Sequence, residues 1–288
     1  MPHSSQHNSS RPRRFRTRPN PPGKPPHRTD PGGGPQNPHP GDQLVRLNKF
    51  LSMAGIASRR RADQLLLEGG ITVNGRIVTD LGHKIDPERD VVFVGGKQAA
   101  IVREHLYLLL NKPKDAITTT SDERGRMTVM NYLQIDRRVF PIGRLDRNTT
   151  GVLLFTNDGD LSNRLMHPRH EIEKAYKATL DKPLSRDHAA QLAKGIDLGD
   201  GRTAPAEIHI IPAGKRKVVG IVLHEGKNRQ VHRMFESLGY TVTRLDRVAY
   251  AGLTYEGVPR GRWRHLTKTE IRRLRTAAGI GETPEETE

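Results

Sequence analysis

The chain contains 288 residues, a length that corresponds to about two domains of ordinary size. It lacks cysteine, which excludes disulfide-stabilised folds, thiolate nucleophiles and metal sites built on thiolates. It has 48 Lys and Arg residues against 32 Asp and Glu residues, a formal net charge of +16. Such an excess is typical of proteins that bind phosphate-rich polymers, although a solubilising charge or an anionic membrane surface would also account for it.

The beginning of the chain differs in composition from the rest. Residues 1–43 hold eleven of the 20 prolines, seven Lys and Arg residues, two Asp residues and no aliphatic side chain. This segment lacks the apolar core of a signal peptide, and no apolar run of the chain approaches the roughly 18 residues of a membrane span. We therefore predict a soluble, cytoplasmic protein without a membrane segment. Residues 1–43 are expected to be a disordered basic tail, which either follows RNA phosphates or only raises solubility.

A small domain is predicted over residues 44–103. Apolar residues recur at helical spacing, Ser58 is placed to cap a second helix, and Asn74-Gly75 is typical of a tight hairpin turn. The pattern predicts two helices followed by short strands, over residues 44–54, 58–68, 71–73, 77–78 and 91–94. The expected fold is a helix–helix–hairpin unit.

Three consecutive arginines, Arg59, Arg60 and Arg61, occupy the first turn of the second predicted helix. The helix dipole disfavours positive charge there, so either a bound phosphate compensates it or the side chains simply extend into water. The segments 46–51, 55–60 and 70–75 resemble, in order and spacing, the S4 RNA-binding domain. The resemblance implies an RNA-binding module in which these arginines contact RNA, but it assigns no function to the whole chain.

A second domain is predicted over residues 104–270. Residues 106–110 form a continuous apolar run that is typical of a buried strand. Because the predicted strands outnumber the helices and do not alternate with them, we expect an α+β fold with a mixed, largely antiparallel sheet. Residues 271–288 are expected to be a frayed tail. Further strands are predicted at residues 139–140, 152–156, 175–180, 207–211 and 218–223 and near Val242 and Arg247, with helices after Asp158 and over 229–238.

The chemistry of this domain has to come from oxygen and nitrogen side chains, since thiols are absent. Asn157–Asp160 matches the start of a calcium-binding loop but lacks the later ligands, so a helix cap is the better interpretation. His167 and His170 flank Pro168 and lack the spacing of a helical ligand pair. No phosphate-binding glycine loop occurs. We therefore predict no metal site and no cofactor.

The loop over residues 141–151 places one carboxylate, Asp146, between Arg144 and Arg147. Neighbouring guanidiniums favour the ionised carboxylate, which at a fixed position can act as a nucleophile or a general base. An Asp that only pairs with an arginine in a turn is the more common arrangement. The loop by itself leaves both interpretations open.

Longer motifs favour the catalytic interpretation. Gly143–Asp146, Thr150-Gly151 and Leu154–Leu161 resemble the catalytic motif of pseudouridine synthases, in particular the RsuA/RluB group, which modifies single sites in ribosomal RNA. Further matching segments follow the same order, at residues 110–113, 167–169, 174–176 and 225–234. Together with the S4-like region, the resemblance covers residues 44–267.

The resemblance implies roles for individual residues. Asp146 corresponds to the family's nucleophile, Arg144 to the arginine beside it, and Tyr176 to a tyrosine that stacks near the target base. Whether the carboxylate first attacks C1′ of the ribose, attacks C6 of the base or removes a ribose proton is left open. The expected substrate-binding residues are Lys227, Arg229, Gln230, His232 and Arg233. His232 stands where many relatives have Arg or Lys, so a pair between it and Asp146 would weaken as the pH rises.

The reaction implied is the isomerisation of one uridine in ribosomal RNA, with large-subunit RNA favoured. It needs no redox change, energy carrier, metal or cofactor. The target base has to leave its stack to reach Asp146, which costs least in loops and bulges. The expected partner is ribosomal RNA or a pre-ribosomal particle, bound by a monomer. Two alternatives share part of the pattern: a non-catalytic RNA-binding or ribosome-assembly factor, and the same chemistry on small-subunit ribosomal RNA or tRNA.

Overall fold

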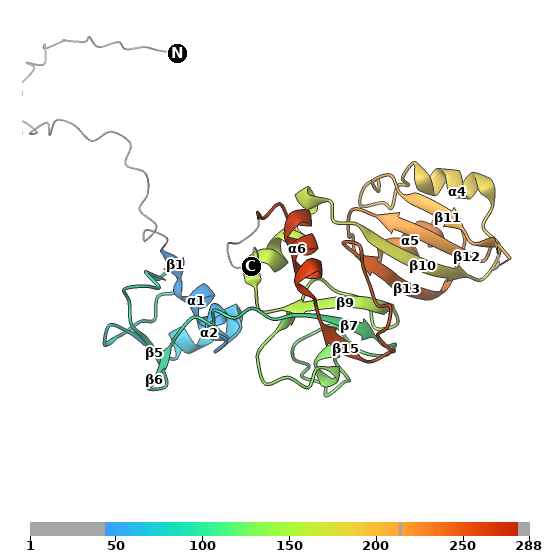
Figure 1. Ribbon diagram of the computed structural model, residues 1–288. Coiled ribbons are helices and arrows are strands. Elements are labelled where there is room, and N and C mark those ends of the chain that lie inside the picture. Colours follow the sequence, from blue (N-terminus) through green and yellow to red (C-terminus); the bar gives the residue numbers. More distant parts are fainter. Residues whose placement is uncertain (1–43, 213–214, 282–288) are drawn as a thin grey trace, which may run out of the picture. The chain divides into compact units, whose positions relative to one another are not determined.

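The computed structural model describes residues 44–212 and 215–281 (Figure 1). The predicted tail, residues 1–43, and the end of the chain lie outside the described residues. Within the described part, residues 44–103 have a hydrophobic core of their own, and the residues that follow build three further core clusters. The helices in these ranges lack the length and apolar character of a membrane span.

The first region follows the predicted pattern closely. Ser58 accepts a hydrogen bond from the backbone N–H of Arg61 and caps the second helix, and Asn74 and Gly75 adopt the positive φ of a tight turn. The first helix begins later than predicted, because Val45–Arg46 pairs as a strand with another segment. The elements are β1 (Val45–Arg46), α1 (Leu47–Met53), α2 (Arg59–Leu67), β2 (Ile71–Val73), β3 (Arg76–Ile77), β4 (Lys84–Ile85), β5 (Val92–Val94) and β6 (Lys97–Ala99).

The second region is built on one mixed sheet. Pairing is antiparallel between the described strands except for β13 and β9, where Arg247 lies opposite Gly151, and this confirms the expected α+β architecture. The main strand order in the described residues is β11 (Glu207–Ile210), β12 (Val218–Leu223), β10 (Lys174–Leu180), β13 (Val242–Tyr250), β9 (Thr150–Thr156), β7 (Tyr107–Lys112) and β15 (Trp263–His265), with β8 (Phe140–Pro141) on β9 and β14 (Leu253–Thr254) on β13.

The parallel contact between β9 and β13 depends on a glycine. Gly151 has a φ of +103°, and a Cβ atom at this position would lie 2.2 Å from the carbonyl oxygen of Arg247. Only glycine permits this approach without moving the backbone. Because Gly151 follows directly after the loop that carries Asp146, this requirement fixes the position of that loop against β13.

Strands β7 and β9 account for the continuous apolar runs in the sequence. One face of β7 and β9 packs on α3 (Gly159–Met166) and α6 (Lys268–Ala277), and the opposite face covers a second cluster that includes Val129 and Leu145. Strands that are buried on both faces do not alternate between apolar and polar residues. Helices α4 (Arg186–Ala193) and α5 (Gln230–Glu236) pack against the half of the sheet that contains β10 to β13 (Figure 1).

The expectation of a frayed tail over residues 271–288 is wrong for its described part. The segment continues the helix α6, Lys268–Ala277, in which the side chain of Leu274 is fully buried. Thr267 and Glu270 form a capping box at its start. The many charged residues of α6 conceal an apolar stripe at helical spacing, and this stripe is what covers β7 and β9.

Candidate active site

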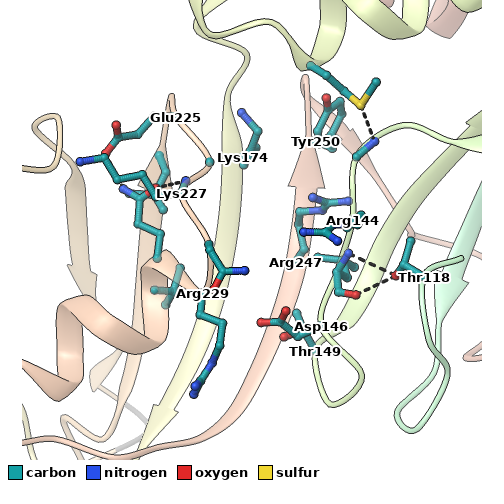
Figure 2. A pocket seen from close by; sticks show the side chains of 18 of the residues that line it. Thr118, Arg144, Asp146, Thr149, Lys174, Glu225, Lys227, Arg229, Arg247 and Tyr250 are labelled. Carbon is teal, nitrogen blue, oxygen red and sulfur yellow. Dashed lines mark hydrogen bonds between the residues drawn. The ribbon is translucent and has the colours of Figure 1, made fainter. Parts of the chain in front are cut away.

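A cavity of about 700 Å³ lies beside β10 and β13, next to the loop that carries Asp146 (Figure 2). Its volume is in the range that holds a nucleotide-sized ligand. The wall includes residues from the Asp146 loop (residues 141–149), from residues 118–120, from β10 and β13, and from the loop that precedes α5. The sequence-predicted residues that line it are Arg144, Asp146, Tyr176, Lys227, Arg229, Gln230 and His232.

The side chain of Asp146 is exposed, while the backbone beside it is held. On one side, the buried hydroxyl of Thr118 donates to the carbonyl oxygen of Leu145 at 2.7 Å and accepts from the Leu145 N–H at 3.3 Å. On the other side, the N–H of Asp115 donates to the carbonyl oxygen of Arg147 at 2.9 Å. Within residues 44–212 and 215–281, the Asp146 carboxylate forms no hydrogen bond or ion pair. Its oxygens are therefore available to a ligand.

Neither of the two neighbouring guanidiniums pairs with the Asp146 carboxylate in the part of the chain that the structure describes. Arg147 instead forms an ion pair with Asp115 at 3.2 Å. Arg144 is exposed and lines the cavity. Local sequence order places the three charges together, but the turn directs Arg147 to a carboxylate from another loop.

A buried lysine, Lys112, holds the backbone of the Asp146 loop in place. Lys112 is completely buried, and its ammonium donates to the carbonyl oxygens of Pro113, Asp146, Arg147 and Thr149 at 2.9–3.2 Å. Burial lowers the pKa of Lys112 to about 8, and the negative charge of Asp146 opposes this shift. In the sequence, Lys112 is distinguished only as part of a segment that matches the family. A lysine at the end of an apolar strand was the signal that could have indicated a buried structural charge.

The loop before α5 (residues 224–229) uses most of its polar groups internally. Gln230 is almost fully buried, donates to Glu225 at 2.6 Å and accepts from the Lys227 N–H at 2.9 Å. The Lys227 ammonium donates to the carbonyl oxygens of Gly201 and Arg202 at 3.1 and 2.8 Å. These residues line the cavity, and their contacts show that they also build its wall.

The remaining predicted residues differ in position. Arg229 lines the cavity and pairs with Glu236 at 3.3 Å, whereas Arg233 pairs with Asp200 and is not part of the wall. Arg59, Arg60 and Arg61 are exposed on the first turn of α2, with Arg61 paired to Glu68 at 3.0 Å. The structure thus brings Arg233 to a stabilising ion pair, and the three arginines remain on the surface of the first region.

His232 lies half-buried in the cavity wall. Burial and the charge of Arg229 lower its pKa, and the negative charge of Asp146 opposes them. The described residues contain no ion pair between His232 and Asp146, and the Nδ1 atom of His232 is buried without a partner. The neutral imidazole is therefore favoured, and His232 does not reproduce the permanent charge of an arginine at this position.

Asp158 forms the helix cap that the sequence predicts. Its carboxylate accepts from the N–H groups of Asp160 and Leu161 at 3.1 and 2.9 Å and from the Tyr107 hydroxyl at 2.9 Å. The described ranges hold no group of three or more His, Asp or Glu side chains placed to bind a metal ion. The calcium-like sequence over 157–160 is therefore explained by capping of α3.

Similarity to known proteins assigns the chain to a family. Residues 106–237 match the family of RNA pseudouridylate synthases, and residues 45–92 match the S4 domain. Ribosomal large subunit pseudouridine synthase B of Bacillus subtilis (strain 168) is 42% identical over 242 residues, which covers 83% of this chain and 98% of that relative. The chain belongs to the RNA pseudouridine synthase family.

A second relative and a solved structure support the same family. Dual-specificity RNA pseudouridine synthase RluF of Escherichia coli (strain K12) is 35% identical over 235 residues, which covers 80% of this chain and 78% of the relative. A crystal structure of a pseudouridylate synthase aligns with a TM-score of 0.60 and 31% identity, covering 80% of this chain and 99% of the other. The predicted resemblance to RsuA/RluB-type synthases with an S4 domain is confirmed.

Proposed function

We propose that this synthase converts one uridine of large-subunit ribosomal RNA to pseudouridine, with Asp146 acting directly on the target nucleotide. The similarity to the B. subtilis relative, whose name specifies the large ribosomal subunit, supports the choice of RNA. The S4 domain adds an RNA-binding module to the same chain. A net charge of +16 provides long-range attraction to the RNA backbone.

The observation that carries the proposal is the state of the Asp146 carboxylate. Its oxygens form no hydrogen bond or ion pair within the described residues, while Lys112 and Thr118 hold the backbone around it. A catalytic group has to be fixed in position and free of competing partners, since its interactions are needed in the transition state. Tyr176, in the same wall, offers an aromatic ring on which a base can stack.

The chemistry requires only groups that this cavity provides. The bond between N1 and C1′ breaks, the uracil turns, and a bond forms between C5 and C1′. C5 loses a proton and N1 gains one, so the nucleotide keeps its composition and oxidation state. We propose that Asp146 assists these steps without a cofactor, as a nucleophile or a base at the ribose or the uracil ring.

Access of the target uridine requires that it leave the helix stack. Base extrusion costs a few kcal/mol, least in loops and bulges, and contacts to the backbone offset it. Arg144 and Arg229, both exposed and in the cavity wall, are placed to contact the strand that enters. The proposed substrate is therefore an irregular segment of ribosomal RNA rather than a regular duplex.

Mapping of pseudouridines in ribosomal RNA, from cells with and without the gene, tests the proposal. Deletion is expected to remove one large-subunit pseudouridine. Wild-type protein and Asp136→Ala, a change at an exposed residue of the same domain, should restore it, and Asp146→Ala should not. An unchanged map would favour a non-catalytic RNA-binding factor. Loss of a small-subunit site would contradict the proposed substrate, and restoration by Asp146→Ala would contradict the proposed mechanism.

A further inference from the structure

Three cavity-lining residues, Lys174, Arg247 and Tyr250, have no role in the proposed chemistry. In the pairing of β10 with β13, Lys174 lies opposite Tyr250 and Tyr176 lies opposite Arg247. Regular alternation would place Arg247 and Tyr250 on different faces of β13. A register shift between Ala175 and Tyr176 inserts one extra residue in β13, so both side chains join Lys174 and Tyr176 on the cavity side.

The two cations surround one aromatic ring. The Arg247 guanidinium lies 4.9 Å from the centre of the Tyr250 ring and the Lys174 ammonium 5.8 Å from it. Arg247 is only 2% exposed and donates through Nε to the carbonyl oxygen of Val152 at 2.8 Å. Lys174 is half-buried and donates to the carbonyl oxygen of Ile172 at 2.6 Å. Both side chains are thereby held in place at the wall.

Neither cation is neutralised by a carboxylate. Across residues 44–212 and 215–281, Lys174 and Arg247 take part in no ion pair, and Nη2 of Arg247 is buried without a hydrogen-bond partner. Burial and the charge of Arg247 lower the pKa of Lys174 to about 8, while Glu225 opposes the shift. Bringing two cations together in a half-buried wall is unfavourable unless an anion binds there.

We propose that Lys174 and Arg247 form a subsite for one backbone phosphate of the RNA strand, next to the target uridine. The inference rests on the proposed function and adds a second contact region to the same cavity. Figure 2 shows Lys174 and Tyr250 toward one end of the pocket and Asp146 toward the other, with Arg247 between them. One nucleotide can thus present its base and ribose to Asp146 while an adjoining phosphate reaches the two cations.

A phosphate fits this subsite better than the uracil ring does. Uracil is neutral and would leave the two positive charges uncompensated, whereas a phosphodiester carries a full negative charge and can accept from an ammonium and a guanidinium together. The cavity of about 700 Å³ also exceeds the space needed for a single base. The strand would then be held on both sides of the reacting nucleotide.

RNA probes in which one backbone phosphate is replaced by a neutral methylphosphonate test the subsite. The probes are synthetic stem–loops that carry the uridine mapped as described above, with a methylphosphonate at the phosphate either 5′ or 3′ to it. Affinity of the wild type is expected to fall about tenfold for one of the two probes, because one charge-assisted contact is lost. Lys174→Met should lower the affinity for the unmodified RNA by a similar factor. This variant should then bind the affected methylphosphonate probe no more weakly than it binds the unmodified RNA.

Matched variants make the test specific. Lys177→Met removes an exposed lysine from the same strand and should leave the difference between the two probes unchanged. Arg247 also supports the contact between β9 and β13. The test therefore uses substitutions of Lys174 and leaves Arg247 in place. If the loss of affinity caused by Lys174→Met added to the loss caused by each methylphosphonate, the subsite would be overturned. It would also be overturned if the wild type bound both methylphosphonate probes as tightly as the unmodified RNA.

A pH series provides an independent readout. Lys174 is charged below a pKa of about 8, and its surroundings are Arg247, Glu225 and the ring of Tyr250, whose own pKa is raised to about 12 by burial. A bound phosphate favours the charged ammonium, so wild-type affinity should decline as the pH rises through 8 to 9. Lys174→Arg keeps its charge and should reduce this decline to the part that Lys112, whose pKa is also about 8, contributes in both proteins. Identical pH profiles for the two proteins would contradict the proposal.

The two proposals can fail separately. A wild-type protein that forms no pseudouridine in ribosomal RNA would refute the proposed function and the subsite with it. An active wild type, whose Lys174→Met variant binds RNA as tightly as the Lys177→Met variant, would refute the phosphate subsite alone.

Discussion

The Asp146 loop and the loop before α5 face the same cavity but use their polar side chains differently. In the Asp146 loop, backbone carbonyls bind Lys112 and the carboxylate of Asp146 remains free. In the loop before α5, Lys227 and Gln230 direct their side chains to neighbouring backbone and side-chain groups. Both loops are polar and both match family motifs. The difference shows that one motif leaves its carboxylate unpaired within the described residues, whereas the other mainly builds the wall of the cavity.

The largest expected effect follows from removing the free carboxylate. Asp146→Asn keeps the size of the side chain and removes its charge, so we expect turnover to fall about a thousandfold or more. The free energy of unfolding should change by less than about 0.5 kcal/mol, because the side chain is exposed and forms no hydrogen bond or ion pair with the described residues. Single-turnover kinetics and thermal unfolding measure the two effects. Asp136→Asn is the matched control, and turnover that is retained in Asp146→Asn would remove the catalytic assignment.

Removal of the buried ammonium should affect both stability and activity. Lys112→Met leaves several carbonyl oxygens of the Asp146 loop without a donor, so we expect a loss of about 2–4 kcal/mol in the free energy of unfolding. The loop should also lose its fixed position and turnover should decrease. Denaturant unfolding and activity assays check this, with the exposed Lys114→Met as control. Equal stabilities for the two variants would show that the ammonium does not hold the loop.

For the loop before α5, we expect a substitution to lower stability more than turnover. Gln230→Leu removes the buried amide that joins Glu225 to the Lys227 N–H, which should cost about 1–3 kcal/mol of stability. Turnover measured below the melting transition should fall less than in Asp146→Asn. Asn228→Leu changes an exposed amide two residues away and should be nearly neutral in thermal unfolding. If Gln230→Leu abolished turnover in a stable protein, the contrast between the two loops would be wrong.

The smallest effect concerns Thr118, whose hydroxyl clamps the residue before Asp146. Thr118→Val keeps the shape and removes both hydrogen bonds, so we expect about a tenfold decrease in kcat with little change in RNA affinity. Thr118→Ser should restore most of the activity, because it retains the hydroxyl. Ser121→Ala, at an exposed residue of the same segment outside the cavity wall, serves as control. A decrease that Ser does not rescue would indicate lost packing rather than lost positioning.

Local patterns in the sequence were sufficient for much of the fold. The cap at Ser58, the turn at Asn74-Gly75 and the continuous apolar strand from Tyr107 depend on residues that are close in the chain, and all three occur as predicted. The cap at Asp158 belongs to the same class. The helix α6 was missed because its apolar residues are separated by charges, and only the sheet beneath it makes their spacing significant.

The sequence by itself determined the family, the two-region organisation and the position of Asp146 in a loop between strands, because these depend on ordered motifs and local periodicity. Only the tertiary structure decided which charges are free. The contact of Lys112 with the Asp146 loop joins residues more than thirty positions apart, and the register shift in β13 turns Arg247 toward the cavity. Such contacts arise from strand pairing and packing between distant segments, and the identity of each residue does not specify the partner that the fold brings to it.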